Sequence, residues 1–189
     1  MALAHALLAS LIEEPCSGYD LSKRFSGSVG FFWNASQQQI YRELTKLEEQ
    51  GWISSQVIPQ QGRPDKKLFS VTDVGRQGLV EWITQPCEPT PLRDDLLVKV
   101  FAGYLVPRPI LLKELERHWE AHSQRLSIYR EIEQQYFSNS QLLSVKDKFV
   151  YMTLRRGIRM ETDSIAWCDE ARALLRQLEE GDRNPRESV

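Results

Sequence analysis

Apolar side chains recur at helical spacing between residues 36 and 50. Ile40, Leu44 and Leu47 fall at i, i+4 and i+7, which predicts an amphipathic helix with one face anchored in a core. Asn34 or Ser36 can cap the first turn, with Gln37 or Gln39 three residues later. The opposite face is polar, and its side chains can hydrogen-bond base edges or phosphates: Ser36, Gln37, Gln38, Gln39, Tyr41, Arg42 and Lys46.

Gly51 ends this helix, and the pattern of a β-hairpin follows it. Residues 53–57 and 69–71 alternate between apolar and polar side chains, as half-buried strands do. The segment between them, residues 59–67, contains Pro and Gly, which favour a turn, and three cations against one anion. A basic hairpin beside a polar helix face can contact backbone phosphates, and its basic residues are Arg63, Lys66 and Lys67.

Three further helices are predicted around this unit. Residues 3–13 and 17–25 have helical patterns, and Thr72 caps a fourth helix that runs through Trp82, with Asp73 in its first turn. This order of helices and hairpin is typical of a winged helix, which inserts one helix into the major groove of DNA. Residues 1–85 are therefore predicted to form a winged helix-turn-helix DNA-binding domain.

A proline-rich segment follows. Pro86, Pro89 and Pro91 lie within six residues and cannot continue a helix, so residues 84–91 are predicted to be an extended connection between two domains. Beyond it we expect a second domain at residues 92–181 and a disordered tail at residues 182–189.

The second domain has the pattern of long helices. One is predicted to end near Phe137, and Ser144 with Asp147 resembles a capping box that opens a last helix ending at Gly181. Apolar residues of the first helix step alternately by 3 and 4, a heptad pattern that indicates packing against another long helix. We interpret this domain as a dimerisation domain; the alternative is that the heptad positions pack only against the chain's own last helix. The predicted contact residues are Leu112, Leu115, Trp119, Leu126, Tyr129, Trp167, Leu174 and Leu178.

Charge and composition alone do not indicate a partner. The 24 basic and 26 acidic residues nearly cancel, and residues 1–85 hold eight Lys and Arg against nine Asp and Glu. Attraction to phosphate must therefore come from local clustering on the helix and the hairpin. We find no signal-peptide pattern and no apolar run as long as a bilayer is thick, which predicts a cytoplasmic protein without membrane contact.

Other chemistry is weakly signalled. Cys16, Cys87 and Cys168 lie far apart in the chain and are interpreted as inert thiols. His118 and His122 have a spacing that can hold a metal, but His122 lies among the heptad positions and is predicted to be a packed, hydrogen-bonded histidine. We expect no metal and no cofactor, and the lack of nucleotide-binding or catalytic motifs predicts that the protein is not an enzyme.

Aromatic residues raise a further question. The run Phe31-Phe32-Trp33 can form part of a ligand pocket. We favour the interpretation that it fills the small winged-helix core. Tyr19 is likewise predicted to pack between helices, although its hydroxyl can reach a phosphate.

The motifs together resemble a known family. Residues 17–21 (SGYDL), 40–44 (IYREL) with 47–48 (LE) and 51–53 (GWI), and 69–75 (FSVTDVG) look like the DNA-binding domain of PadR-type transcriptional regulators. Residues 95–103 and 154–158, ending near Trp167, look like the larger virulence-regulator type of C-terminal domain. One departure is Gln37 to Gln39, where the family usually has a glycine or small residue, so base preference does not transfer from relatives.

The resulting interpretation is a mainly α protein with a winged helix-turn-helix domain and an α-helical C-terminal dimerisation domain. We expect a homodimeric, sequence-specific DNA-binding regulator, a repressor, whose partners are a double-stranded DNA operator and, by the family resemblance, a small-molecule effector. The alternative is a winged-helix protein-interaction adaptor that does not read DNA sequence. No residue pattern identifies an effector or an operator.

Overall fold

The computed structural model describes residues 2–12, 14–26, 33, 35–60, 62, 65–89, 91, 93–139 and 141–182. The chain divides into two compact units, residues 1–90 and 91–189. Several predictions fall outside the described residues, namely those on Phe31, Phe32, Asn34, Arg63 and residues 183–189. Among the described residues, we find no helix with the length and apolar character needed to cross a membrane.

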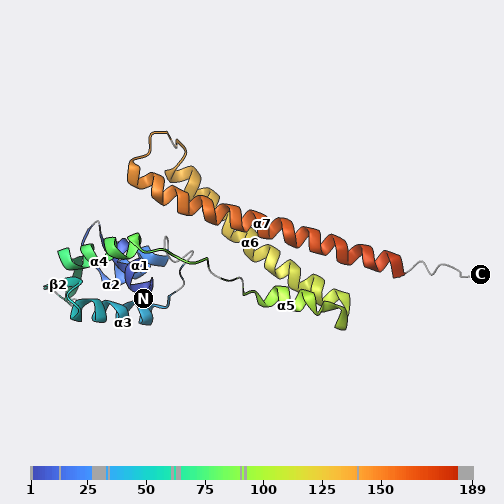
Figure 1. Ribbon diagram of the computed structural model, residues 1–189, viewed down its shortest axis with the longest axis horizontal. Coiled ribbons are helices and arrows are strands. Elements are labelled where there is room, and N and C mark those ends of the chain that lie inside the picture. Colours follow the sequence, from blue (N-terminus) through green and yellow to red (C-terminus); the bar gives the residue numbers. More distant parts are fainter. Residues whose placement is uncertain are drawn as a thin grey trace, which may run out of the picture. The chain divides into compact units, whose positions relative to one another are not determined.

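The N-terminal unit combines four helices with a small antiparallel sheet (Figure 1). The sheet has the strand order β1-β3-β2, so the hairpin β2–β3 carries β1 at its other edge. The four predicted helices and the hairpin are confirmed. The elements in chain order are α1 (Ala2–Leu11), β1 (Cys16–Ser17), α2 (Gly18–Ser26), α3 (Gln37–Glu49), β2 (Ile53–Ile58), β3 (Lys66–Val71) and α4 (Asp73–Thr84).

Strand β1 was not predicted. Cys16 pairs with Phe69 and Ser17 with Leu68, so Ser17, which was predicted to begin a helix, extends the sheet instead. Two residues are too few to show an alternating pattern, and the sequence therefore carries no periodic signal for this strand.

Helix α3 is held between the core and its two caps. Ile40, Leu44 and Leu47 are at most 1% exposed, as the spacing predicted, and pack with apolar residues of α1 and α2. Gly51 follows the C-cap with φ +71°, a conformation that glycine adopts at little cost, and turns the chain into β2.

The hairpin is joined to α4 through a close backbone contact. The backbone N–H and the hydroxyl of Thr72 both donate to the carbonyl oxygen of Trp52, each at 3.0 Å. The hydroxyl of Thr72 also accepts from the N–H of Gly75, which confirms Thr72 as the cap of α4. A Cβ atom at Gly75 would lie 2.0 Å from that same Trp52 oxygen, so glycine is required for the approach.

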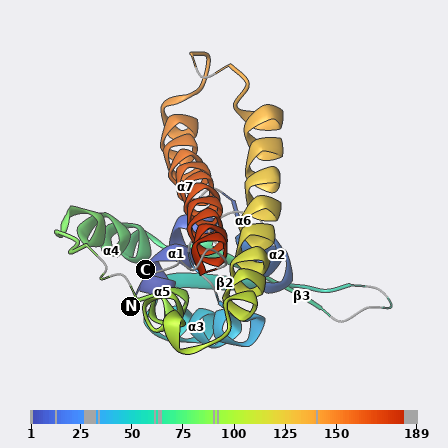
Figure 2. The same cartoon turned by 90° about the vertical axis from the view of Figure 1, so that its right-hand side faces the viewer.

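The C-terminal unit is an antiparallel helical hairpin with two short elements before it. Helices α6 and α7 lie side by side along their length (Figure 2). Its elements are α5 (Asp95–Phe101), the 3-10 helix η2 (Gly103–Leu105), α6 (Arg108–Tyr136) and α7 (Val145–Asp182). The predicted cap at Ser144 forms before α7, because its hydroxyl accepts from the backbone N–H of Asp147 at 3.1 Å. The Asp147 carboxylate accepts from that same hydroxyl at 2.6 Å, and not from the backbone N–H of Ser144 as in a capping box.

Part of the predicted heptad pattern packs within a single chain. Leu115 is fully buried and Tyr129 is 3% exposed, although the chain stands alone. Trp119 and Trp167 pack around the buried Leu96, Leu115 and Cys168. These four predicted dimer residues therefore contact the chain's own helices, as the alternative interpretation proposed.

The remaining predicted dimer residues differ from these. Leu112 and Leu126 are half-buried. Leu174 and Leu178, near the end of α7, are each 56% exposed in the single chain and so are available to a partner.

A buried carboxylate links the two long helices. Glu161 of α7 is 1% exposed and lies 2.5 Å from Nδ1 of His122 and 3.4 Å from Arg125, both on α6. His122 is thus a packed, hydrogen-bonded histidine, as predicted. No group of three His, Cys, Asp or Glu among the described residues has a geometry that could hold a metal ion.

The three cysteines are free thiols in different surroundings. Cys16 and Cys168 are buried, and burial raises the pKa of both thiols, which lowers their reactivity. Cys87 is exposed in the connection between the units.

Candidate nucleic-acid interface

The polar face of α3 is open to solvent. Gln37, Gln38, Tyr41, Arg42 and Lys46 are all exposed, on the side opposite the three buried aliphatic residues. The side chain of Arg42 makes no hydrogen bond or ion pair with any other described residue, and that of Lys46 lies 3.4 Å from Glu43 on the same helix. The helix therefore presents amide, phenol and guanidinium groups that can hydrogen-bond a nucleic acid.

Two of the residues predicted to contact DNA stabilise the start of α3. The hydroxyl of Ser36 accepts from the backbone N–H of Gln39 at 3.2 Å, and the side chain of Gln39 accepts from the N–H of Ser36 at 2.8 Å. This capping box satisfies two backbone donors at the helix start. Ser36 and Gln39 therefore fix the first turn, and Gln37 and Gln38 project from it.

Tyr41 is held in place by a glycine of the preceding helix. A Cβ atom at Gly18 would lie 2.6 Å from Cε1 of Tyr41, so the ring packs directly over the start of α2. Its side chain remains 41% exposed. Gly18 was not predicted as a site residue. Its importance comes from the close approach of the Tyr41 ring, which no sequence pattern shows.

Two expectations about aromatic residues are wrong. Tyr19 is 64% exposed in the first turn of α2, so it does not pack between helices. Trp33 is 39% exposed, so this member of the aromatic run does not fill the core. Tyr19 therefore lies at the surface, at the residue after the Gly18 that the Tyr41 ring contacts.

Lys66 and Lys67, at the start of β3 next to the hairpin turn, are paired with carboxylates. They belong to the strand and not to the turn segment in which the sequence pattern placed them. Lys66 lies 2.9 Å from Asp20 of α2, and Lys67 lies 2.7 Å from Glu48 in the last turn of α3. Sequence reasoning identified both lysines and missed both acids. The two residues of each pair lie far apart in the sequence, so no local spacing rule predicts the pairing.

Both carboxylates are stabilised in the charged form. Hydrogen bonds from Lys67 and Ser55 hold the pKa of Glu48 below its usual value. Hydrogen bonds from Ser17 and Lys66 do the same for Asp20. Each lysine therefore faces a full negative charge near neutral pH, and each pair carries no net charge.

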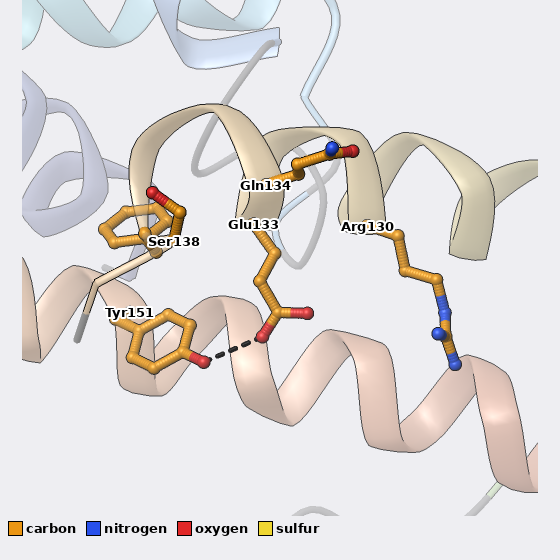
Figure 3. Close-up of a pocket in the computed structure, with 6 residues that line it drawn as sticks. Arg130, Glu133, Gln134, Ser138 and Tyr151 are labelled. Atoms are coloured by element: carbon orange, nitrogen blue, oxygen red, sulfur yellow. Dashed lines mark hydrogen bonds between the residues drawn. The ribbon is translucent and has the colours of Figure 1, made fainter.

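Two hollows occur in the C-terminal unit. One, of about 570 Å³, lies between the end of α6 and the start of α7, where Tyr151 donates to Glu133 at 2.7 Å (Figure 3). The same carboxylate oxygen of Glu133 also accepts from Arg155 at 2.9 Å. The other hollow, of about 490 Å³, is mainly apolar and includes Tyr104, Val106, Leu111, Leu174 and Leu178.

Family models match both halves of the chain. Residues 7–81 match the family described as "Transcriptional regulator PadR-like family", and residues 92–176 match "Virulence activator alpha C-term". A Mycobacterium tuberculosis protein named as a probable transcriptional regulator is 37% identical over 187 residues, covering 94% of this chain and 99% of that protein.

Two solved proteins share the fold over most of the chain. The virulence activator AphA of Vibrio cholerae has a TM-score of 0.76 at 34% identity, covering 93% of this chain and 99% of AphA. PadR of Bacillus subtilis in complex with operator DNA has a TM-score of 0.80 at 25% identity, with the same coverage of both chains. That Bacillus protein is named a negative transcriptional regulator and has also been solved with p-coumaric acid.

These findings define a winged-helix transcriptional regulator with a helical second half. The chain belongs to the PadR-like family of transcriptional regulators, and the resemblance inferred from its sequence motifs is confirmed. The predicted mainly α fold with a winged helix is confirmed as well.

Proposed function

We propose that this protein binds a specific double-stranded DNA operator as a homodimer and regulates transcription from it. The observation that carries the proposal is the division of α3 into two faces. Ile40, Leu44 and Leu47 lock one face in the core, while the other presents exposed polar side chains on a rigid support. A helix supported in this way suits the major groove, where side-chain hydrogen bonds distinguish the base pairs.

The homodimer is supported by an apolar surface that a single chain leaves uncovered. Phe101 and Tyr104 are 87% and 85% exposed, and Leu105 is 70% exposed. Leu174 and Leu178 border the apolar hollow beside this surface. Large contiguous apolar patches on soluble proteins usually mark protein interfaces. A second copy placed by a two-fold axis would cover the same patch on both chains.

Selection of bound sequences from a random DNA pool tests the proposal. We expect enrichment of two related half-sites about one helical turn apart, because a symmetric dimer presents two copies of α3 to the DNA. Binding should weaken steeply with salt, since each neutralised phosphate releases counterion. A pool that stays unenriched would favour the alternative function, a winged-helix adaptor that binds proteins, and would leave the exposed face of α3 without its DNA partner.

Helix α3, the proposed reading helix, and the hairpin are expected to affect DNA binding in different ways. Replacing Arg42 or Gln38 with alanine should change the preference at particular base pairs, by about 1–3 kcal/mol each where the lost contact is bidentate. Replacing Lys66 with alanine should weaken all sequences about equally, because phosphate contacts carry little sequence information. Affinities measured for a set of single-base operator variants separate the two effects. A base-specific change from the lysine variant alone would contradict the assignment of α3 as the reader.

The direction of regulation and the effector stay predictions. We propose a repressor, in line with the name of the Bacillus relative, while the Vibrio relative is named an activator. A small-molecule effector is supported by the p-coumaric acid complex of that Bacillus protein. We further propose that the protein works in the cytoplasm and catalyses no reaction. Transcription of a reporter with the selected operator at its promoter tests the direction, because a repressor lowers it.

A further inference from the structure

Glu48 bridges the reading helix and both strands of the hairpin. One carboxylate oxygen accepts a hydrogen bond from the hydroxyl of Ser55 on β2, and the other lies 2.7 Å from Nζ of Lys67 on β3. Ser55 pairs with Phe69 and Val57 with Lys67, so these residues share one face of the hairpin. That face is directed toward α3, since Phe69 is buried in the core and Glu48 reaches it from the last turn of α3.

The neighbouring lysine points to the other face. Side chains of successive strand residues alternate between faces, and Lys66 accordingly meets Asp20 of α2. Each lysine at the start of β3 thus pairs with a carboxylate from a different helix, Lys66 with α2 and Lys67 with α3. The side chains of Lys67 and Glu48 remain 46% and 31% exposed, so solvent and a nucleic acid can reach the pair.

A phosphate group would compete with Glu48 for the same ammonium group. The pair contributes little to the stability of the fold, because exposed ion pairs are screened by water and salt. We expect the pair to matter more for DNA binding than for folding. A lysine that is already neutralised by a carboxylate releases fewer counterions from the DNA when it contacts a phosphate. The N-terminal 85 residues carry one more acidic than basic residue, so a single carboxylate is a substantial part of the local balance.

We infer that Glu48 restrains the sequence-independent affinity of this protein for DNA by holding Lys67 in an internal ion pair. The inference rests on the proposed function, because it needs Lys67 to face backbone phosphate in the complex. It identifies an acidic residue, beside the polar residues of α3, that governs how strongly the protein binds DNA of any sequence.

The test uses the full-length protein and a duplex of random sequence. Glu48→Gln keeps the size of the side chain and removes its charge. We expect the variant to bind more tightly, with a slope of log affinity against log salt steeper by about 0.9, the value for one additional phosphate contact. For two proteins that bind equally at 1 M salt, this difference in slope gives a gain of roughly eightfold at 0.1 M salt.

Glu49→Gln is the matched control. Glu49 is the next residue on α3, is exposed, and makes no ion pair with any other described residue. The substitution makes the same change in net charge and should leave the salt slope unchanged. A second control combines Glu48→Gln with Lys67→Met, which should abolish the gain because no lysine is then released.

The possible outcomes separate the inference from the proposed function. Equal gains in the Glu48 and Glu49 variants would show an effect of net charge alone and would overturn the inference. Weaker binding by a Glu48→Gln variant whose thermal unfolding is unchanged would also overturn it, since Glu48 would then support the bound hairpin. Failure of the unaltered protein to bind any duplex would instead refute the proposed function.

Discussion

A fragment that ends at Thr84 is expected to fold and to bind a two-half-site operator about a hundred to ten thousand times more weakly than the full chain. Folding is expected because α1 to α4 and the sheet share a core of their own, including Leu7, Leu21 and Ile40. The loss of operator affinity is expected because the fragment lacks the C-terminal unit, which we propose joins two winged-helix domains. Without that link, the second half-site contact is no longer an intramolecular event.

Circular dichroism and electrophoretic mobility shifts check both parts of this expectation. The fragment should retain a cooperative thermal transition. It should bind a single half-site about as tightly as one winged-helix domain of the full-length protein does. A fragment that bound the full operator as tightly as the intact protein would show that residues 91–189 do not link two DNA-binding units. Their task would then be effector sensing or recruitment of a partner protein.

The reading helix was the most predictable part of the molecule. Its signals are local: three aliphatic residues at helical spacing, a capping pair and a terminal glycine act within one or two turns. The hairpin was predicted for the same reason, because alternation and turn residues are also local. Only the choice between the two capping pairs was left open, and it fell to Ser36 with Gln39.

The parts that could not be predicted depend on contacts across long separations. Strand β1 exists because β3 offers a free edge to Cys16 and Ser17. Glu48 and Lys67 meet because the hairpin folds back along α3, 19 residues further on. A single sequence carries no pattern that joins such pairs, since each residue taken alone is an ordinary surface charge.

The dimer surface shows a different limit. A heptad pattern states that a helix face is apolar, but it does not name the partner helix. In this chain α7 folds back along α6 and buries Leu115 and Tyr129, which satisfies part of the pattern internally. Exposure in the folded chain therefore distinguishes residues left for a partner, such as Leu174, from residues with the same spacing that face the core.

This distinction leads to contrasting expectations for two leucines. Leu174→Asp is expected to leave the chain folded and to shift it from dimer to monomer, because Leu174 is 56% exposed on the proposed interface. Operator affinity should fall along with the dimer, by a factor similar to that of the fragment. Leu115→Asp should instead unfold the C-terminal unit, since it places a charge at a fully buried position at a cost of several kcal/mol.

Sedimentation velocity combined with urea unfolding distinguishes the two outcomes. Gln124→Asp, an exposed polar position on α6, controls for the added charge and should change neither the oligomeric state nor the unfolding midpoint. A Leu174→Asp protein that sediments as a dimer with unchanged operator binding would exclude the end of α7 from the interface. The joining contacts would then lie elsewhere on the apolar surface, and the exposed Phe101 and Tyr104 are the next residues to replace.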